Sequence, residues 1–458
     1  MTERTIAAVS TPYGKGGVAL IRVSGEKAVQ ICENVFSRKN KIKLADTASN
    51  HAVYGDIYHE NEMIDDGIAV VYRTPHSYTG EDVVEITCHG GILLTKLTLE
   101  SALLNGAEPA EAGEFTKKAF LNGKMGLIGA ETVMNLIEAE SKEKLKFSSS
   151  PAGRNLELKI AGLYEEIRFL LSGIYAFIDF PDEDLSDVTA DELLCCLKKL
   201  VSDIDAIIKT YKTGRALNEG ILTVIAGKPN TGKSSLLNLL AGENRAIVTD
   251  IAGTTRDIIE ETVSLGKVLL RLCDTAGIRP TSDAVEKIGV ERAVGKLDEA
   301  ELVMFVLDSS EELDENDLSL AERLKNSGKT VIAVVNKSDL RSAIDLDYIK
   351  NTFPHTVALS AVNGEGADTL IKTIEDIYLG HEIDYGSSII VASARQYASL
   401  KNAREYILDG IDALENGFTQ DVACIGLESA MAKLGEIDGG TVTAEIIHEI
   451  FSRFCVGK

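Results

Sequence analysis

The residues with the clearest chemical potential form a glycine-rich loop, GKPNTGKS, at residues 227–234. An apolar run that favours a strand, residues 221–226, precedes the loop, and a helix-favouring run, residues 235–240, follows it. In the pattern G-x-x-x-x-G-K-S, the glycines let successive backbone N–H groups point at phosphate oxygens, and the helix N-terminus adds positive potential. We therefore expect Lys233 to reach the β- and γ-phosphates of a nucleotide and Ser234 to ligate Mg²⁺, which prefers oxygen ligands.

A second motif, NKSD at residues 336–339, indicates that the base is guanine. It ends an apolar, strand-like run, residues 331–335. The carboxylate of Asp339 can accept hydrogen bonds from both N–H groups on the guanine edge, a donor pair that adenine lacks. Ser360 and Ala361 fit a backbone contact to the guanine carbonyl. Alone, NKSD could be a helix cap, but a phosphate loop upstream favours guanine recognition.

A third motif, DTAG at residues 274–277, follows the strand-like residues 268–273. We expect its aspartate to hold Mg²⁺ through water and Gly277 to lie close to the γ-phosphate. The next residue is Ile278, where Ras-like GTPases carry the glutamine that orients the attacking water. Hydrolysis in this chain must therefore be organised differently.

The string GTTRD, residues 253–257, belongs to the expected first switch. The hydroxyl of Thr255 is the natural ligand to complete the Mg²⁺ shell when the γ-phosphate is present. Arg256 could act as an arginine finger in cis, although a salt bridge with a local acid is the more frequent fate of a loop arginine.

The elements around these motifs divide the chain of 458 residues into about three domains, at about 150 residues per domain. Apolar residues recur every three or four positions on both sides of the nucleotide motifs, which predicts amphipathic helices over 156–178, 193–208, 400–414 and 427–437. Each helix needs a partner for its apolar face, so one helical domain interrupted by the GTPase is the economical interpretation. Pro151 should break its first part. The acidic run at residues 179–184 is more often a helix-ending turn than a metal site.

The first part of the chain has a different pattern. Short β-rich pieces at residues 18–23, 68–72 and 83–87 precede a helical stretch at residues 92–104, which predicts an α+β domain. We expect the boundaries 1–120 for this domain, 121–219 for the first part of the helical domain, 220–379 for the GTPase domain and 380–458 for the second helical part. The predicted fold class is thus multidomain α/β and α+β, with a P-loop GTPase domain inserted into a discontinuous helical domain.

Composition and net charge indicate the cellular compartment and the kind of partner that we expect. The start, MTERTIAAVS, lacks the features of a signal peptide, and no apolar run approaches the roughly 18 residues needed to span a bilayer. Seven scattered cysteines without metal-ligand spacing indicate a reducing, cytoplasmic environment, and we expect Cys195 and Cys196 to be buried helix residues rather than a redox pair. The net charge of −24 opposes nucleic-acid binding, so a nucleic-acid substrate would need a more basic partner protein.

Five further segments carry a family resemblance: TPYGKGGVALIRVSG near the start, SYTGEDVVEITCHGG, GEFTKKAFLNGK, IDFPDED and the terminal CVGK. Over essentially its whole length the chain resembles the MnmE (TrmE) family of tRNA modification GTPases. The resemblance implies that a potassium ion beside the phosphate loop replaces an arginine finger, held by Asn230, Thr249, Thr254 and the carbonyl of Ile251. It also implies that Glu286 orients the attacking water, while Pro280 departs from the charged residue expected in the second switch.

Motifs and resemblance together give the expected GTP-binding set: Asn230, Thr231, Gly232, Lys233, Ser234, Ser235, Thr249, Asp250, Ile251, Ala252, Gly253, Thr254, Thr255, Asp274, Thr275, Ala276, Gly277, Asn336, Lys337, Asp339, Ser360 and Ala361.

The resemblance also implies that the first domain binds a 5-formyl-tetrahydrofolate-type cofactor and holds a homodimer. Carried over by position, the folate contacts are Arg22, Glu81, Lys124 and Lys458. Glu81 suits the donor edge of a pterin, and the cations suit glutamyl carboxylates. Gly126 and Gly129 stand where the family usually has an acid and a glutamine. Cys455 could be a reactive thiol, but a small packed hydrophobe is at least as frequent.

The implied function is GTP hydrolysis coupled to the formation, with the flavoprotein MnmG, of an aminomethyl-type group at carbon 5 of the wobble uridine of certain tRNAs. Folate would supply the carbon, and the partner's flavin would carry the redox chemistry. The alternative is a regulatory GTPase switch that binds ribosomes or partner proteins and uses hydrolysis as a timer.

Overall fold

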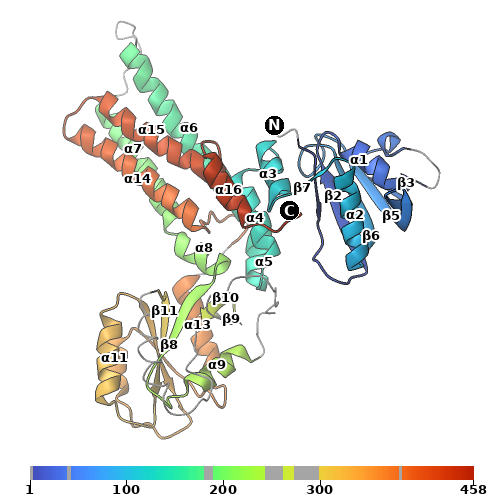
Figure 1. Ribbon diagram of the computed structural model, residues 1–458. Coiled ribbons are helices and arrows are strands. Elements are labelled where there is room, and N and C mark those ends of the chain that lie inside the picture. The colour runs from blue at the N-terminus through green and yellow to red at the C-terminus, as the bar shows by residue number, and fades with distance from the viewer. Residues whose placement is uncertain (1–3, 39–42, 180–188, 243–260, 273–298, 381–383) are drawn as a thin grey trace. The chain divides into compact units, whose positions relative to one another are not determined.

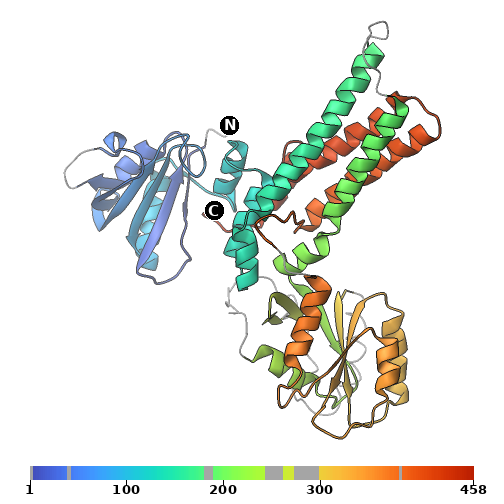
Figure 2. The ribbon, with the colours of Figure 1, turned by 180° about the vertical axis from the view of Figure 1, so that it is seen from behind.

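The computed structural model describes residues 4–38, 43–179, 189–242, 261–272, 299–380 and 384–458 (Figures 1 and 2). The chain forms two compact units. The terminal unit contains residues 1–134 and 432–458, and the central unit contains residues 135–431. None of the helices in these described ranges combines the length and the apolarity needed to cross a membrane.

The terminal unit is built on a seven-stranded sheet in the order β3-β4-β5-β6-β2-β1-β7. The strands are β1 (Ile6–Val9), β2 (Val18–Ser24), β3 (Phe36–Arg38), β4 (His51–His59), β5 (Glu62–Tyr72), β6 (Val83–His89) and β7 (Glu108–Pro109). Strand neighbours are antiparallel except β1 and β7. Because side chains alternate along a strand, β2 buries Ile21 and Val23 on one face and places the half-buried Arg22 on the other.

Helices cover the sheet with different cores on its two faces. Helices α1 (Ala28–Val35) and α2 (Ile92–Leu104) and the short 3₁₀ helix η1 (Leu44–Asp46) share the larger core with the sheet. On the other face, Phe115 of α3 (Glu114–Leu121) packs with Ile6 and Ala8 of β1. The predicted helix at 92–104 and the three predicted strands are confirmed, whereas sequence patterns missed β1, β3, β4 and β7.

The end of the chain returns to this first domain. Phe451 of α16 (Ala444–Ser452) packs with Phe454 and with Leu127 of α4 (Leu127–Ile137). Val456 forms a β-bridge with Ala112, and the Ser10 hydroxyl donates to the Gly457 carbonyl at 2.9 Å. The last residues are therefore part of the terminal unit.

The central unit contains a six-stranded sheet in the order β13-β12-β11-β8-β10-β9. The strands are β8 (Ile221–Ala226), β9 (Glu261–Leu265), β10 (Val268–Leu272), β11 (Leu302–Asp308), β12 (Thr330–Asn336) and β13 (His355–Ala358). Among these strands, only β9 and β10 pair antiparallel. All seven residues of β11 are buried, as expected for a parallel strand covered on both faces.

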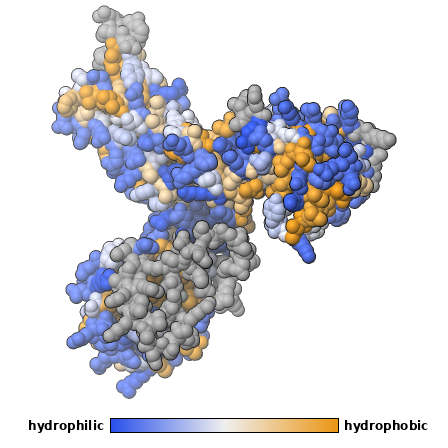
Figure 3. All heavy atoms as spheres, viewed as in Figure 1, coloured by the Kyte–Doolittle hydropathy of each residue, from blue (hydrophilic) through white to orange (hydrophobic). Residues whose placement is uncertain are grey.

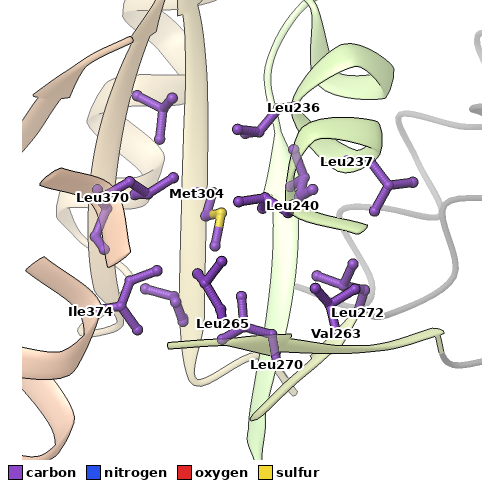
Figure 4. Close-up of a cluster of buried hydrophobic side chains, with 14 of the residues drawn as sticks. Leu236, Leu237, Leu240, Val263, Leu265, Leu270, Leu272, Met304, Leu370 and Ile374 are labelled. Carbon is purple, nitrogen blue, oxygen red and sulfur yellow. The ribbon is translucent and has the colours of Figure 1, made fainter. Parts of the chain in front are cut away.

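Helices α9 (Lys233–Ala241) and α13 (Ala367–Tyr378) cover one face of this sheet, and α11 (Glu315–Lys325) and α12 (Leu346–Thr352) cover the other. Figure 4 shows Leu236 and Leu240 of α9 facing Met304 of β11, with Leu370 and Ile374 of α13 in the same cluster. Packing in this core fixes the position of α9, which begins at the end of the glycine-rich loop.

The remaining helices of the central unit are α5 (Lys142–Ser149), α6 (Ala152–Asp179), α7 (Ala190–Ile208), α8 (Tyr211–Asn218), α14 (Ala394–Glu415) and α15 (Gln420–Asp438), which extends into the terminal unit. The chain breaks between α5 and α6 at Pro151, as predicted. Helices α7 and α14 lie side by side and antiparallel, because Asp205 pairs with Arg404 at 2.6 Å and Lys198 with Glu415 at 2.7 Å.

The six-stranded sheet and its helices, β8 to α13, lie in sequence between α8 and α14, which confirms the predicted inserted architecture. One prediction about the helices is wrong. Cys195 and Cys196 lie in α7 but are exposed, because Leu193 and Leu197 take the buried side of that helix.

Candidate nucleotide-binding site

The phosphate loop connects the buried strand β8 to helix α9, as the motif requires. Gly227 has φ 149° and Gly232 has φ 93°, backbone conformations that side chains rarely adopt. A Cβ at Gly227 would also collide with the Val306 carbonyl of β11. Asn230, exposed at the turn of the loop, has φ 65°. The loop therefore takes a path that its glycines permit.

The first turn of α9 begins directly after Gly232, which gives the helix no side-chain cap. Its leading N–H groups are therefore available to an anion. Lys233 donates from Nζ to the carbonyls of Gly227 at 2.9 Å and Lys228 at 2.6 Å. Ser234 is exposed and Ser235 half-buried in the same turn. This arrangement can receive phosphate oxygens and a hydrated Mg²⁺ ion.

Asn336, at the end of β12, connects three of the predicted motifs. Its side chain is buried, with a residue exposure of 2%. Its Nδ2 group donates to the Thr231 carbonyl at 2.8 Å, and its Oδ1 accepts from the Ala361 N–H at 2.9 Å. One amide thus joins the phosphate loop, the NKSD motif and the loop that carries Ser360 and Ala361.

Lys337 follows with φ 61° and forms an ion pair with Asp308 at the end of β11. Burial disfavours the charge of Asp308, but hydrogen bonds from Lys337 and Ser310 outweigh burial and hold the pKa of this carboxyl below its usual value. The Lys337 carbonyl accepts from the Ser309 hydroxyl at 2.7 Å. Asp339 is exposed, so its carboxylate is accessible to a guanine base.

Sequence reasoning missed Asp308. The only signal was an acid at the end of an apolar run, and many strands end that way.

The Ser360 loop is ordered by its own hydrogen bonds. Ser360 is fully buried, its N–H donates to the Glu365 carbonyl at 2.9 Å, and its hydroxyl accepts from the Asn363 N–H at 3.3 Å. The Ser338 N–H donates to the Leu359 carbonyl at 3.1 Å. Because β8, β11, β12 and β13 are parallel, the loops after them meet at one sheet edge, where ligands of such folds bind.

Several predicted site residues lie outside the described residues. These are Thr249, Asp250, Ile251, Ala252, Gly253, Thr254, Thr255, Arg256, Asp274, Thr275, Ala276, Gly277, Ile278, Pro280 and Glu286.

The four predicted folate contacts all belong to the terminal unit. Arg22 pairs with Glu85 of β6 at 2.8 Å and lies over the ring of Tyr78, 5.3 Å from its centroid. Its Nη1 also donates to the carbonyl of Gly457 at 3.4 Å, next to the terminal Lys458. The strand positions thus bring Arg22 to the end of the chain.

Glu81 accepts hydrogen bonds from Lys118 at 2.9 and 3.0 Å and from the Ser24 hydroxyl at 3.0 Å. Lys118 is buried, and sequence reasoning missed it because it stands beside Lys117 in a pair that resembles a surface charge cluster. Lys124 donates to the Pro75 carbonyl at 2.9 Å. Each of these charges already has a partner, so a ligand must share or replace those contacts.

Two departures from the expected pattern have structural correlates. A side chain at Gly126 would collide with the carboxylate of Asp438, so an acid from α15 fills that space. A Cβ added at Gly129 would lie 3.2 Å from the Cβ of Met125, which is a tight contact. Cys455 is exposed, so its interpretation as a packed hydrophobe is wrong.

The match to known proteins covers the entire chain. Residues 5–124 match the family model described as "GTP-binding protein TrmE N-terminus", and residues 127–455 match the "MnmE helical domain" model. The chain is 41% identical to the "tRNA modification GTPase MnmE" of Thermoanaerobacter pseudethanolicus over 462 aligned residues, which cover 100% of both chains. The chain belongs to the MnmE family of tRNA modification GTPases. It is therefore a GTP hydrolase that acts in tRNA modification.

Other members give the same result. The proteins of the same name from Clostridioides difficile and Staphylococcus haemolyticus are 40% and 41% identical, with 100% and 99% of this chain covered and 99% of each relative. The helical-domain match spans the inserted GTPase segment, in agreement with the discontinuous fold.

Proposed function

We propose that this protein is a potassium-stimulated GTPase that acts with the flavoprotein MnmG. The product is an aminomethyl or carboxymethylaminomethyl group at carbon 5 of the wobble uridine of certain tRNAs. Full-length membership of a tRNA modification GTPase family supports this function, and the observation that carries the GTPase part is the junction at Asn336. That junction connects the phosphate loop with the proposed guanine-binding motifs, which supports a single nucleotide that contacts both.

In the proposed site, the loop N–H groups and Lys233 bind the phosphates, and Asp339 binds the guanine edge. Ser234 is exposed at the start of α9, where its hydroxyl fits a hydrated Mg²⁺, a role we also assign to Thr255. Asn230, exposed at positive φ, fits a monovalent cation, together with Thr249, Thr254 and the Ile251 carbonyl. When bound, potassium would offset charge that develops in the transition state.

We assign Glu286 to the orientation of the attacking water. The residue that follows DTAG is Ile278, which has no group for this task, so an acid elsewhere in the second switch is required. Both residues belong to the segment for which the structure gives no description, and the assignment stays a prediction of the family pattern.

For the one-carbon step we propose that a 5-formyl-tetrahydrofolate-type cofactor binds the terminal unit. Arg22, Lys124 and Lys458 offer cations for its carboxylates, and Glu81 offers an acceptor for the pterin donors. Lys118 and the Ser24 hydroxyl hold the Glu81 carboxylate in one orientation, and the pterin donors would share its remaining acceptor positions. Folate would supply the carbon that is transferred.

The assembly we propose is a cytoplasmic homodimer of this chain joined to MnmG. A net charge of −24 opposes direct contact with tRNA phosphates, which supports a partner that carries much of the RNA contact. The alternative function, a regulatory switch that binds ribosomes or partner proteins, shares the GTPase site but not the modification.

Nucleoside mass spectrometry of tRNA separates these two functions. A strain that lacks this gene should accumulate hypomodified wobble uridine. The wild-type gene should restore the modification, whereas a gene with Lys233→Ala should not. Normal wobble uridine in the deletion strain would favour the regulatory switch and remove the proposal.

A further inference from the structure

The second residue of the phosphate loop, Lys228, binds carboxylates far along the chain. Its ammonium group lies 3.1 Å from Glu311, 3.3 Å from Asp314 and 3.0 Å from Asp317. The Lys228 side chain is 17% exposed and that of Asp317 only 3%. Burial disfavours the lysine charge, but the hydrogen bonds it donates to these carboxylates outweigh burial and raise its pKa. This partly buried cluster involves none of the residues expected to touch GTP.

Two of these acids, Asp314 and Asp317, are held in place by hydrogen bonds at the start of α11 (Glu315–Lys325). Asp314 caps α11, and its Oδ1 accepts from the N–H groups of Asn316 and Asp317 at 2.9 Å each. In return, Asp317 Oδ2 accepts from the Asp314 N–H at 3.4 Å, which completes a capping box. The helix end is therefore a rigid anchor for the loop.

The backbone of Lys228 connects this anchor to the nucleotide motif. Its carbonyl accepts from Lys233 Nζ at 2.6 Å and from the Thr231 hydroxyl at 3.0 Å. Thr231 is fully buried, and its own carbonyl accepts from Asn336. A displacement of Lys228 would thus move the groups that hold the phosphate-binding lysine.

The segment that carries these acids also contacts the NKSD motif at residues 336–339. Asp308 pairs with Lys337, and the neighbouring Ser309 donates to the Lys337 carbonyl at 2.7 Å. We call residues 308–317 the acidic strut. One end of the strut binds the guanine motif, and the other end binds the phosphate loop through Lys228.

We propose that Lys228 is a positioning residue for GTP, because its contacts with the acidic strut fix the phosphate loop relative to the guanine motif. A nucleotide engages both motifs at once, so a loop that is already in place loses less conformational freedom on binding. Lys228 acts through the loop backbone rather than through its own contact with the nucleotide.

Fluorescent GDP titrations and steady-state GTPase kinetics on the full chain test this role. Lys228→Met should weaken GDP binding about tenfold and raise KM for GTP while kcat at saturation changes little. Lys228→Arg keeps the charge and should stay within about threefold of the wild-type affinity. Lys325→Met removes an exposed lysine at the other end of α11 and should leave the affinity unchanged.

The pair Lys228 and Asp317 gives a second, independent measurement. Asp317→Asn should weaken GDP binding by itself. The double variant should bind GDP no more weakly than Lys228→Met alone, because Lys228→Met already removes the contact that Asp317→Asn breaks. The Asp317→Asn variant alone remains informative even if Lys228→Met does not fold.

Wild-type affinity in Lys228→Met or in Asp317→Asn would overturn the inference, even if the melting temperature fell, because the pair would then only stabilise the fold. Losses that simply add in the double variant would overturn it as well.

Discussion

Removal of the Asn336 side chain is the sharpest test of how the nucleotide motifs are held together. Asn336→Ala leaves the Thr231 carbonyl and the Ala361 N–H without the partners that lie 2.8 and 2.9 Å away. Both hydrogen bonds are buried, and an unsatisfied buried group costs about 1–3 kcal/mol. We expect the GTPase domain to lose about 3 kcal/mol of stability in total.

The assay is differential scanning fluorimetry of the full chain together with a fluorescent GDP titration. At about 2–4 °C per kcal/mol for a domain of this size, the melting transition of the GTPase domain should fall by about 6–12 °C. GDP affinity should also fall, because the same amide orders the phosphate loop.

Two variants sharpen this comparison. Asn336→Asp keeps an acceptor for Ala361 but buries a charge facing the Thr231 carbonyl, so it should be at least as destabilising as alanine. Asn326→Ala, at an exposed position after α11, should change neither quantity. An Asn336→Ala protein with normal melting and normal GDP affinity would refute the reasoning that this amide joins the motifs.

Four further predictions concern catalysis, assembly and pH. GTP turnover should rise strongly when potassium replaces sodium, and Asn230→Ala should abolish the rise; equal rates in the two salts would exclude the cation site. Glu286→Ala should lower kcat by the equivalent of about 2–4 kcal/mol without weakening GTP binding, so normal turnover with weak binding would contradict the water-orienting role. Light scattering should show a dimer in all nucleotide states, while a distance probe on the GTPase domains shortens with GDP, aluminium fluoride and potassium; a monomer or a constant distance would remove the proposed cycle. The pKa of Asp308 is held below its usual 3.8, so its stabilisation is complete above that value and is lost as the pH falls below it. Asp308→Asn should therefore flatten the loss of stability on acid titration, and an unchanged acid limb would show that the pair with Lys337 contributes nothing.

Local sequence determined the elements of this protein where the interactions are short in range. The phosphate loop is recognisable because Gly227 and Gly232 take conformations that their own lack of a side chain permits. Helix α2 matches its predicted bounds at Ile92–Leu104, and the chain breaks at Pro151, because proline cannot continue a helix. The insertion of the GTPase domain was also predictable, since the unpartnered apolar faces of helices on both sides required one another.

Only the tertiary structure decided which polar groups meet. Asn336 reaches Thr231 across 105 positions of sequence, Lys118 reaches Glu81 across 37, and Arg22 reaches the Gly457 carbonyl across 435. No periodicity or motif encodes such pairs, because each depends on strand order and on the path of the loops between them. In the same way, Lys228 was one loop lysine among 47 basic residues until the fold placed α11 beside it. Local sequence therefore determines the conformation of a residue when the energy of that conformation depends on the residue itself and its near neighbours. The partner of a buried charge depends instead on chain segments that only folding brings together.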